Sequence, residues 1–422
     1  MHEKLFPCVV CLNHRYFPES ANAANVVGAT SFALNVIECL EKQKLLSGII
    51  LYKRDESIKV PILDEHQTKG HLIFTLRFNF NMKPICIKKS IEEALLKMKL
   101  KQQIPYYPIV YYQTDTLMKY HPDYIPSVVT HHGPFVDDFI KHYSFSEACV
   151  AYETVEKTKH LIKYQKEGLS SLIKLKNAYV LQHSELQRKY LIASGFNEKK
   201  ILKITPPIQT PCTNQSHIRK AILDFTNPNA DNLIFISTVA RIDHFKNIDL
   251  FVKSSLILLE QNLPVKIFIA GDRLHFDSNR EALYQLIPRK HEEKFFICES
   301  LSKNELYSLF CLLKQRAVFV CTSRYETLGI TPLEASLSGV YTVAPDIESV
   351  EASRYMPENC KYSYTVSGLA KHLQHIYSSE IYRSKYQYYF VNNRLSYNKF
   401  EKSLLCGLEK ISNELHSLLI SH

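Results

Sequence analysis

The sequence contains no long apolar run. A membrane-spanning helix needs about 18–20 consecutive apolar residues, and no segment of the 422 residues approaches that length. The apolar stretch near the N-terminus, Phe6 to Leu12, is short, and no small-residue cleavage site follows it, so a secretory signal is not expected. The sequence therefore predicts a cytoplasmic protein.

The sequence also lacks a second Cys/His pair at the spacing of a zinc site. Among 11 cysteines the one closely spaced pair is Cys8-Val-Val-Cys11, in a run of strand character. A C-x-x-C can be a redox motif or half of a zinc site, but here nothing supplies the other half. We interpret the cysteines as buried thiols that act as small hydrophobic side chains. An odd number of them needs no disulfide framework in a reducing compartment.

The composition is that of an ordinary soluble globular chain, 45% hydrophobic and 22% charged. The length predicts two domains rather than one core. The net charge of +10 is uneven, because residues 1–205 carry +8 and the remainder +2. The excess positive charge can lie on solvated helix faces, or it can create a field that attracts an acidic acceptor or the inner face of a membrane. It gathers at Lys97, Lys99, Lys101, Lys157, Lys159, Lys163, Lys166, Lys174 and Lys176.

Strand-like and helix-like segments alternate through the first half of the chain. Such alternation predicts βα units around a mostly parallel sheet. A helix over 20–43 begins with Ser20 as its cap. The expected strands are 7–13, 47–55, 71–79, 108–115, 126–133, 177–184 and 199–208, and the other expected helices are 91–103, 144–168 and 185–196.

A segment rich in proline and asparagine, 205–232, then predicts a linker. A second alternating set follows, and an amphipathic helix over 396–419 ends the chain. We expect two Rossmann-like, doubly wound α/β domains facing a central cleft, where ligands of such sheets usually lie. The expected strands are 233–240, 265–271, 294–300, 317–322 and 341–345, and the helices 247–261, 280–290, 302–315 and 332–339.

Two cations lie in the loop after the first strand of the second half. In "TVARIDHFKNIDL", Arg241 and Lys246 precede a helix that begins near Asn247. A helix N-terminus presents free N–H groups and positive dipole, so two cations there suit a pyrophosphate. Arg can make a forked contact with it and Lys acts as a point charge. The alternative is a solvated basic loop.

Two glutamates, Glu326 and Glu334, are separated by seven residues in "RYETLGITPLEASLSGV". Glu326 follows a strand and therefore lies on the ligand side of the sheet. Thr331 to Glu334 has the T-x-x-E form of a capping box, with Pro332 at the first helical position, so Glu334 can be a helix cap. Alternatively, two carboxylates at one cleft edge can bind the hydroxyls of a ribose and of a second sugar.

Taken in order, these motifs closely resemble the retaining, nucleotide-sugar-dependent glycosyltransferases of family 4, which have the GT-B fold. The resemblance implies an acceptor-binding domain over 1–205, to which a C-terminal helix at about 396–422 packs back, and a nucleotide-sugar-binding domain over 206–395. The resemblance is clear over roughly residues 120–420. Over residues 1–120 it rests only on the pattern of alternating strands and helices. It rests on Arg241/Lys246, 267–272, 300–310, Glu326-x7-Glu334, 177–208 and 396–419.

The resemblance implies a role for each of these side chains. Arg241 and Lys246 would hold the diphosphate and offset charge on the departing nucleotide. Glu334 would bind the ribose hydroxyls, and Glu326 would contact hydroxyls of the donor sugar near the reacting carbon.

Other residues would complete the donor site. The backbone amides of Thr327, Leu328 and Gly329 would line the sugar pocket. In "VVTHHGPF", His132 would touch the donor sugar near the anomeric centre, and His131 is the competing assignment.

The chain departs from the family at several glycines, and it has only 11 in total. Where the family has paired glycines near the donor phosphates, this chain has Ala23 and Ala24, and Gly28 is the nearest glycine that can take that role. Ala240 replaces the glycine before the phosphate-binding arginine. Glu348-Ser349 stands where a glycine pair often follows. These departures leave the identity of the acceptor and of the sugar open, and they affect the diphosphate site less.

The resulting prediction is retaining transfer of a hexosyl or N-acetylhexosaminyl group to an acceptor hydroxyl or amine. UDP is the expected nucleotide because it is the commonest donor in the family, and no metal or other cofactor is expected. The acceptor stays open between a small metabolite, a glycan and a lipid-linked carrier, the last with peripheral contact at the inner membrane face. Alternatives are an inactive GT-B binding or scaffold protein and a related epimerase or phosphorylase; nucleic acid is not expected as a partner.

Overall fold

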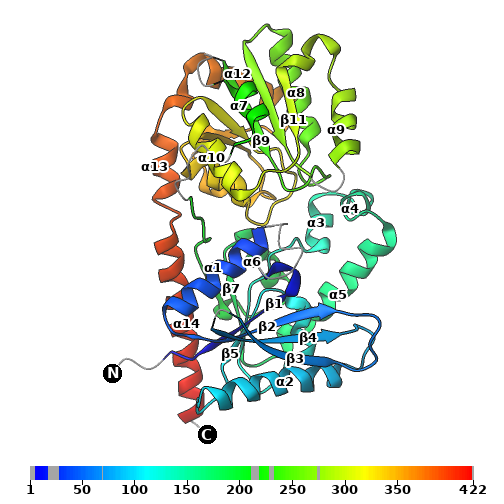
Figure 1. Ribbon diagram of the computed structural model, residues 1–422, viewed down its shortest axis with the longest axis vertical. Coiled ribbons are helices and arrows are strands. Elements are labelled where there is room, and N and C mark those ends of the chain that lie inside the picture. Colours follow the sequence, from blue (N-terminus) through cyan, green and yellow to red (C-terminus); the bar gives the residue numbers. More distant parts are fainter. Residues whose placement is uncertain are drawn as a thin grey trace. The chain divides into compact units, whose positions relative to one another are not determined.

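The computed structural model describes residues 5–17, 28–68, 70–210, 218–227, 232–272 and 276–420. The chain divides into two compact units (Figure 1). The N-terminal unit comprises Met1–Pro207 and Asn398–His422, and the C-terminal unit comprises Ile208–Tyr397. The sequence had predicted boundaries after residue 205 and near residue 396. Each unit is an α/β structure built on one mostly parallel sheet, so the predicted fold class is confirmed.

The sheet of the N-terminal unit has the strand order β3-β4-β2-β1-β5-β6-β7-β8. Its strands pair in parallel, except that β3 runs antiparallel to β4. The strands are β1 (Cys8–Asn13), β2 (Leu46–Arg54), β3 (Ile62–Thr68), β4 (His71–Phe78), β5 (Ile109–Tyr112), β6 (Ser127–Val129), β7 (Ala178–Gln182) and β8 (Ile201–Lys203).

The sequence did not predict β3. Its residues, ILDEHQT, are exposed or half-buried at the edge of the sheet. An edge strand that buries so little apolar surface lacks the alternating pattern from which strands are predicted.

The helices of this unit are α1 (Gly28–Lys42), α2 (Pro84–Lys101), α3 (Val136–His142), α4 (Phe145–Ala151), α5 (Val155–Lys174), α6 (Glu185–Ala193) and α14 (Tyr397–Ile420). The single helix predicted over 144–168 is wrong. Ser144 caps α4 in a capping box with Glu147, and Thr154 caps a separate helix, α5. Each cap satisfies the free N–H groups of a new first turn, which starts a second helix. The predicted cap Ser20 lies outside the described residues.

The central strand β1 is buried, and its two cysteines are 0% and 2% exposed. Strands covered on both faces read as continuous apolar runs, which is why "CVVCLN" predicted this strand. Burial raises the pKa of the Cys8 thiol to about 12, so that thiol stays protonated at neutral pH. The ten cysteines that the structure describes are free. The interpretation of Cys8 and Cys11 as buried hydrophobic side chains is confirmed.

The last helix, α14, belongs to the N-terminal unit from Asn398 onward (Figure 1). One face of it is buried at helical spacing. Two of its serines accept hydrogen bonds from backbone N–H groups of the unit: Ser412 from Phe6 at 3.1 Å and Ser403 from Thr205 at 2.9 Å. The buried face consists of Phe400, Leu404, Leu408, Ile411 and Leu415.

The sheet of the C-terminal unit has the order β11-β10-β9-β12-β13-β14, with every pair parallel. Numbered from β9, this is 3-2-1-4-5-6, the order of dinucleotide-binding Rossmann folds. The strands are β9 (Leu233–Thr238), β10 (Val265–Ala270), β11 (Phe295–Cys298), β12 (Ala317–Val320), β13 (Tyr341–Pro345) and β14 (Lys361–Tyr362).

The helices of this unit are α7 (Lys220–Thr226), α8 (Ile248–Glu260), α9 (Phe276–Gln285), α10 (Lys303–Leu313), α11 (Ile330–Leu337), α12 (Val366–Ser379) and α13 (Tyr386–Asn392). The linker predicted over 205–232 is partly wrong because α7 lies within it. Ile218 and Ile222 are buried in the core of the C-terminal unit, and this anchors the segment. α7 has only seven residues, and so short a helix shows too little of the helical period to be predicted from its apolar residues.

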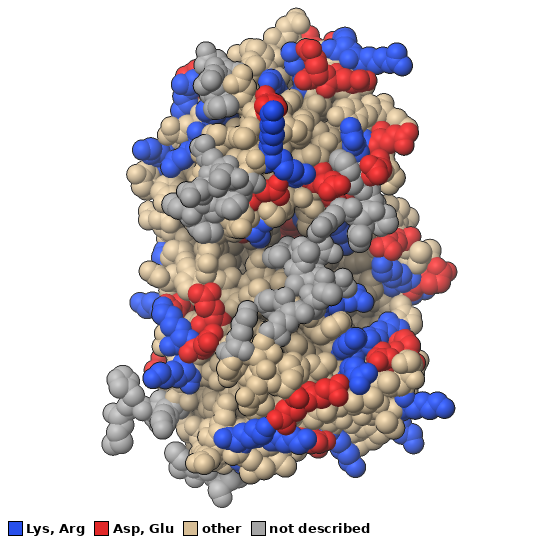
Figure 2. Space-filling view, viewed as in Figure 1, with Lys and Arg blue, Asp and Glu red and all other residues tan. Residues whose placement is uncertain are grey.

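The surface charges are interspersed rather than segregated on the face drawn in Figure 2. Several of the lysines that the sequence grouped together are paired with carboxylates, which agrees with solvated helix faces. These pairs are Lys97–Glu93 at 2.7 Å, Lys157–Glu153 at 2.9 Å, Lys166–Asp137 at 2.9 Å and Lys101–Glu65. Within the described ranges, no helix has the length and apolarity that crossing a membrane requires.

We expect Leu404→Ala to destabilise the protein by about 2–5 kcal/mol, because it leaves a cavity under the buried face of α14. Urea unfolding followed by circular dichroism measures this change. Leu100→Ala is the matched control, since Leu100 is 66% exposed on α2. Equal effects of the two substitutions would show that α14 is not a stabilising part of the unit.

Candidate functional site

The strand order of the C-terminal sheet reverses between β9 and β12. At such a point the loops that follow the two neighbouring strands diverge, and ligands of open α/β sheets bind there, outside the carboxyl ends of the strands. Lys246 lies in the loop after β9, and Glu326 lies in the loop after β12. The fold thus brings two predicted site residues to one end of the sheet.

Lys246 and Glu326 form an ion pair across this point of reversal. Their side chains are only 22% and 13% exposed, so the pair is partly desolvated. Burial alone would lower the pKa of Lys246, but the charge of Glu326 and the hydrogen bond between them outweigh it and raise that pKa. The ammonium is therefore fully protonated at neutral pH.

Arg324 joins the two loops that carry this pair. Its backbone N–H donates to the Phe245 carbonyl at 2.8 Å, and its Nε donates to the His244 carbonyl at 3.1 Å. Its guanidinium also donates to Asn247 Oδ1 at 2.9 Å, and Asn247 is the N-cap residue of α8. Sequence analysis missed Arg324, and its position two residues before Glu326 was the available signal.

Glu326 is held on the other side by the segment after β13. Its N–H donates to the Ser349 carbonyl at 2.8 Å, and its carbonyl accepts from the Glu351 N–H at 2.9 Å. Gly329 precedes α11 at φ +76°, and a Cβ there would lie 2.6 Å from Ala352 Cβ and 2.9 Å from Glu326 Oε2. Both the backbone conformation and the space therefore require glycine at 329.

Between Glu326 and Gly329, Thr327 is half-buried and Leu328 is buried. Together with Gly329 they form the turn that leads from Glu326 into α11. The contribution of their amides to ligand binding stays a prediction.

Glu334 lies inside α11, with its side chain 4% exposed. Lys303 Nζ lies 2.6 Å from its Oε1 and 2.9 Å from its Oε2, and the Tyr307 hydroxyl donates to Oε1 at 2.7 Å. The predicted capping box is wrong. The left-handed Gly329 starts the helix at Ile330, so Glu334 is past the first turn and faces α10 instead of the helix end.

Sequence analysis missed both partners of Glu334. Lys303 and Tyr307 are four residues apart on α10 and therefore share one helix face. That spacing was the only signal in the sequence, and it does not point to a partner on another helix.

Arg241 is 67% exposed and pairs with Asp243 at 3.1 Å, rather than with either predicted glutamate. Its loop is fixed from β10, since Asp272 Oδ2 accepts a hydrogen bond from the Ile242 N–H at 3.2 Å. Ala240, where the family has glycine, does not adopt a positive φ. Alanine is therefore compatible with the backbone at this position.

In the N-terminal unit the two adjacent histidines have different surroundings. His131 is 6% exposed, its Nδ1 lies 2.8 Å from Asp115 Oδ1, and its ring stacks on Phe135 at 3.7 Å between centroids. His132 is only partly buried, and its Nε2 lies 3.0 Å from Gln113 Oε1. His131 is thus held between Asp115 and Phe135, and His132 is held by Gln113. The assignment of His132 as the histidine that contacts the donor sugar stays a prediction.

Desolvation lowers the pKa of His132 well below its ordinary value, and the charges of His183 and His131 add to the effect. His132 is therefore neutral near pH 7 and can exchange hydrogen bonds without carrying charge. Gln113 follows β5 and Gly28 opens α1 after β1, so both lie where the order of the N-terminal sheet reverses. The predicted positions Ala23 and Ala24 lie outside the described residues.

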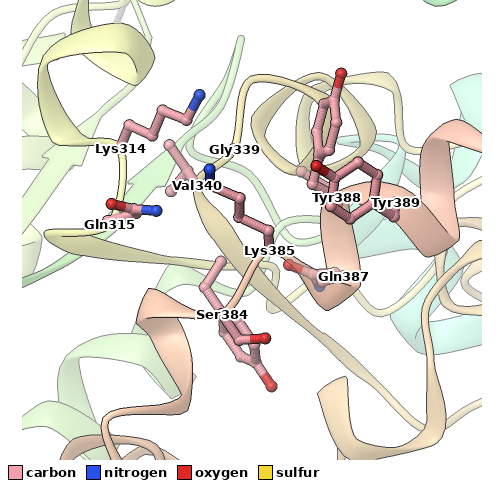
Figure 3. Close-up of a pocket in the computed structure, with 11 residues that line it drawn as sticks. Lys314, Gln315, Gly339, Val340, Ser384, Lys385, Gln387, Tyr388 and Tyr389 are labelled. Carbon is pink, nitrogen blue, oxygen red and sulfur yellow. The ribbon is translucent and has the colours of Figure 1, made fainter.

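A cavity of about 150 Å³ lies in the C-terminal unit, and Figure 3 shows residues that line it. It lies where β13 begins, at the opposite end of the sheet from these loops. No predicted site residue lines it. Two of its lysines, Lys314 and Lys385, have no ion pair in the described part of the chain, but Lys314 is the C-cap of α10, where a cation complements the helix dipole. Its lining includes Lys314, Gln315, Gly339, Tyr341, Lys385 and Tyr389.

No group of three or more His, Cys, Asp or Glu side chains in the described ranges is arranged to hold a metal ion. The ion pairs at the two glutamates instead use lysine as the cation.

Residues 220–390 match the family model "Glycosyl transferases group 1", and this match lies within the C-terminal unit. No curated protein is similar to the chain in sequence.

Solved structures resemble the whole chain. A glycosyltransferase from Rickettsia africae aligns with a TM-score of 0.65 at 13% identity, over 97% of this chain and 99% of that one. HepE from Anabaena, in complex with UDP and glucose, aligns with a TM-score of 0.59 at 12% identity, over 99% of this chain and 100% of that one. Trehalose 6-phosphate synthase from Burkholderia multivorans aligns with a TM-score of 0.65 at 10% identity, over 98% of this chain and 100% of that one. The chain has the GT-B fold, as predicted.

We expect Lys246→Met to destabilise the protein by about 1–3 kcal/mol, because it leaves the partly buried Glu326 carboxylate without its cation. The double substitution Lys246→Met/Glu326→Gln should recover part of that loss. Urea unfolding of the wild type and these variants, with Glu326→Gln alone, completes a double-mutant cycle. Additive effects would mean that the two side chains do not interact in solution.

The stability of the N-terminal unit should fall as the pH drops below about 6.5. Burial lowers the pKa of His121 to about 4 and that of His183 to about 3, so the unfolded chain binds protons that the folded chain excludes. The two neutral histidines contribute their full stabilisation above the pKa of unfolded histidine, about 6.5. Between that pH and the folded pKa, each histidine lowers the free energy of unfolding by about 1.4 kcal/mol for each pH unit of acidification.

Urea unfolding between pH 7 and pH 4 measures this slope. The slope gives the number of protons taken up on unfolding, and His121→Asn should reduce that number by about one. His66→Asn is the control for the introduced amide, because His66 is exposed. A slope that His121→Asn leaves unchanged would contradict the assignment.

Proposed function

We propose that this protein is a retaining glycosyltransferase that moves a hexosyl or N-acetylhexosaminyl group from a nucleotide diphosphate sugar to an acceptor hydroxyl or amine. The observation that supports it most is the Lys246–Glu326 ion pair at the reversal of strand order, in a chain with the GT-B fold. Glu334, buried in the helix that follows, adds a second carboxylate at the same end of the sheet.

The diphosphate binds to Lys246 and Arg241 in this proposal. The Lys246 ammonium has three N–H donors, so it can contact phosphate oxygens while it keeps its bond to Glu326. The Arg241 guanidinium is exposed and can make a forked contact. Both precede the N-terminus of α8, whose dipole favours an anion. Two cations can offset the charge of the leaving group, so the proposal needs no metal ion.

The sugar and the ribose bind to the carboxylates. Glu326 accepts hydrogen bonds from hydroxyls of the donor sugar, beside the turn formed by Thr327, Leu328 and Gly329. Glu334 accepts from the ribose hydroxyls. Neutral His132, in the N-terminal unit, contacts the donor sugar near the anomeric carbon.

The reaction breaks the bond between the anomeric carbon and the diphosphate oxygen. The acceptor oxygen or nitrogen bonds to the same face of that carbon, and its proton passes to the leaving phosphate. Retention at the anomeric carbon follows from this front-face course, so no carboxylate has to act as a nucleophile. The protein contributes preorganised charge and orientation.

UDP is the first nucleotide to test, because the similar structure of HepE is in complex with UDP and glucose. The acceptor is assigned to the N-terminal unit, as a small metabolite, a glycan or a lipid-linked carrier. Peripheral contact with the inner face of a membrane belongs to the last of these.

Calorimetric titration with UDP, GDP, ADP and the matching nucleotide sugars tests the donor site. We expect one nucleotide to bind, and Lys246→Ala and Glu334→Ala each to weaken it at least tenfold, since each removes a charged contact worth about 1.5–3 kcal/mol. Lys361→Ala is the matched control, because Lys361 pairs at 2.6 Å with the exposed Glu358.

Thermal unfolding of each variant separates lost binding from lost folding. If no nucleotide binds to the wild type, or if the two substitutions leave binding unchanged, the proposed enzyme is rejected. The remaining interpretation is then a GT-B binding or scaffold protein without catalytic activity.

A further inference from the structure

We propose that Lys303 and Tyr307 are positioning residues that orient the Glu334 carboxylate toward the ribose of the donor, so that the site prefers ribonucleotides. The three side chains are called the Glu334 cluster below. This inference rests on the proposed function, because it assigns the ribose to Glu334.

The two partners reach Glu334 from the first turns of α10. Ser302 caps this helix in a capping box with Glu305, which fixes the turn that carries Lys303. Lys303 and Tyr307 follow at a spacing of four residues and face the same way. α10 follows β11 and α11 follows β12, so the cluster joins two helices that begin at the carboxyl end of the sheet.

The hydrogen bonds are distributed unevenly over the carboxylate. Oε1 accepts from both the Lys303 ammonium at 2.6 Å and the Tyr307 hydroxyl at 2.7 Å. Oε2 accepts only from Lys303, at 2.9 Å, among the described residues. A carboxylate offers about four lone-pair sites, so Oε2 keeps the greater capacity to accept from a ligand. Two donors on one oxygen and one on the other also fix the rotation of the carboxylate plane.

Burial explains why the cation is needed. The Glu334 side chain is 4% exposed, and a buried carboxylate without a partner charge is strongly disfavoured. The Lys303 side chain is 30% exposed, so the ion pair reaches solvent on the lysine side. Burial, with the charge of Glu334, raises the pKa of Tyr307, so its hydroxyl keeps the proton that it donates. Lys303 and Tyr307 therefore both donate hydrogen bonds to the Glu334 carboxylate.

An oriented, buried acceptor discriminates between ligands that have and lack hydroxyl groups. A site built to bind a hydroxyl rejects the analogue without it, because the buried polar group is then left unpaired. When either positioning residue is removed, the carboxylate can rotate or bind water, and that penalty disappears. The preference for ribose over deoxyribose should therefore depend on Lys303 and Tyr307 as well as on Glu334.

The test compares the affinities of UDP and 2′,3′-dideoxy-UDP by calorimetry, with GDP or ADP and its analogue if that nucleotide binds. We expect the wild type to prefer the ribonucleotide at least tenfold, in line with two lost hydroxyl contacts. Lys303→Met, Tyr307→Phe and Glu334→Gln should each reduce that preference to about threefold or less. The affinity for the dideoxy analogue should change much less, because the diphosphate contacts are intact.

Matched controls keep the comparison specific. Lys361→Met removes an ion pair to an exposed carboxylate, and Tyr341→Phe removes a buried hydroxyl at the opposite end of the sheet. Both should retain the full preference for the ribonucleotide. Lys303→Arg should restore part of the preference that Lys303→Met loses, because it returns a cation to Glu334.

The outcomes separate the two proposals. If Glu334→Gln loses the preference while Lys303→Met and Tyr307→Phe keep it, Glu334 binds the ribose unaided and this inference is wrong, although the proposed function stands. If the wild type binds no nucleotide, the proposed function fails first. Tyr307→Phe conserves the ring and its packing, so it decides the question even if Lys303→Met does not fold.

Discussion

The ion pair between Lys246 and Glu326 links the two loops on either side of the point where the C-terminal sheet reverses its strand order. The rest of the candidate site depends on that link. Arg324 fastens the same two loops through three hydrogen bonds to the β9–α8 loop, and the conformation of Gly329 directs the chain from Glu326 into α11. Without this pairing the two loops would carry isolated, partly buried charges.

Each carboxylate of the pair of glutamates has its own lysine, Lys246 for Glu326 and Lys303 for Glu334. This arrangement gives each carboxylate a partner cation in a partly dry environment, where an unpaired charge would be unfavourable. Both carboxylates are thereby held by contacts within the protein. Preorganised charge of this kind is the main protein contribution to reactions in which a charged group departs, as in the proposed transfer.

Much of the fold could be predicted from the sequence, because buried parallel strands read as apolar runs and most helices carry caps or apolar stripes. The errors have specific causes. The edge strand β3 buries too little to show a pattern, and α7 has only seven residues and so shows little of the helical period. α4 and α5 are separated by local caps. Spacing alone also suggested a capping box for Glu334, which the left-handed Gly329 excludes by starting the helix earlier.

The sequence by itself determined which residues carry the charge of the candidate site, since Arg241, Lys246, Glu326 and Glu334 are identifiable from their order and spacing. Only the tertiary structure decided how they are paired. Lys303 and Tyr307 are 31 and 27 residues from Glu334, and Lys246 is 80 residues from Glu326. Contacts over such separations arise from the order of strands in the sheet. That order is set by the packing of helices and strands against one another, and no local sequence pattern encodes it.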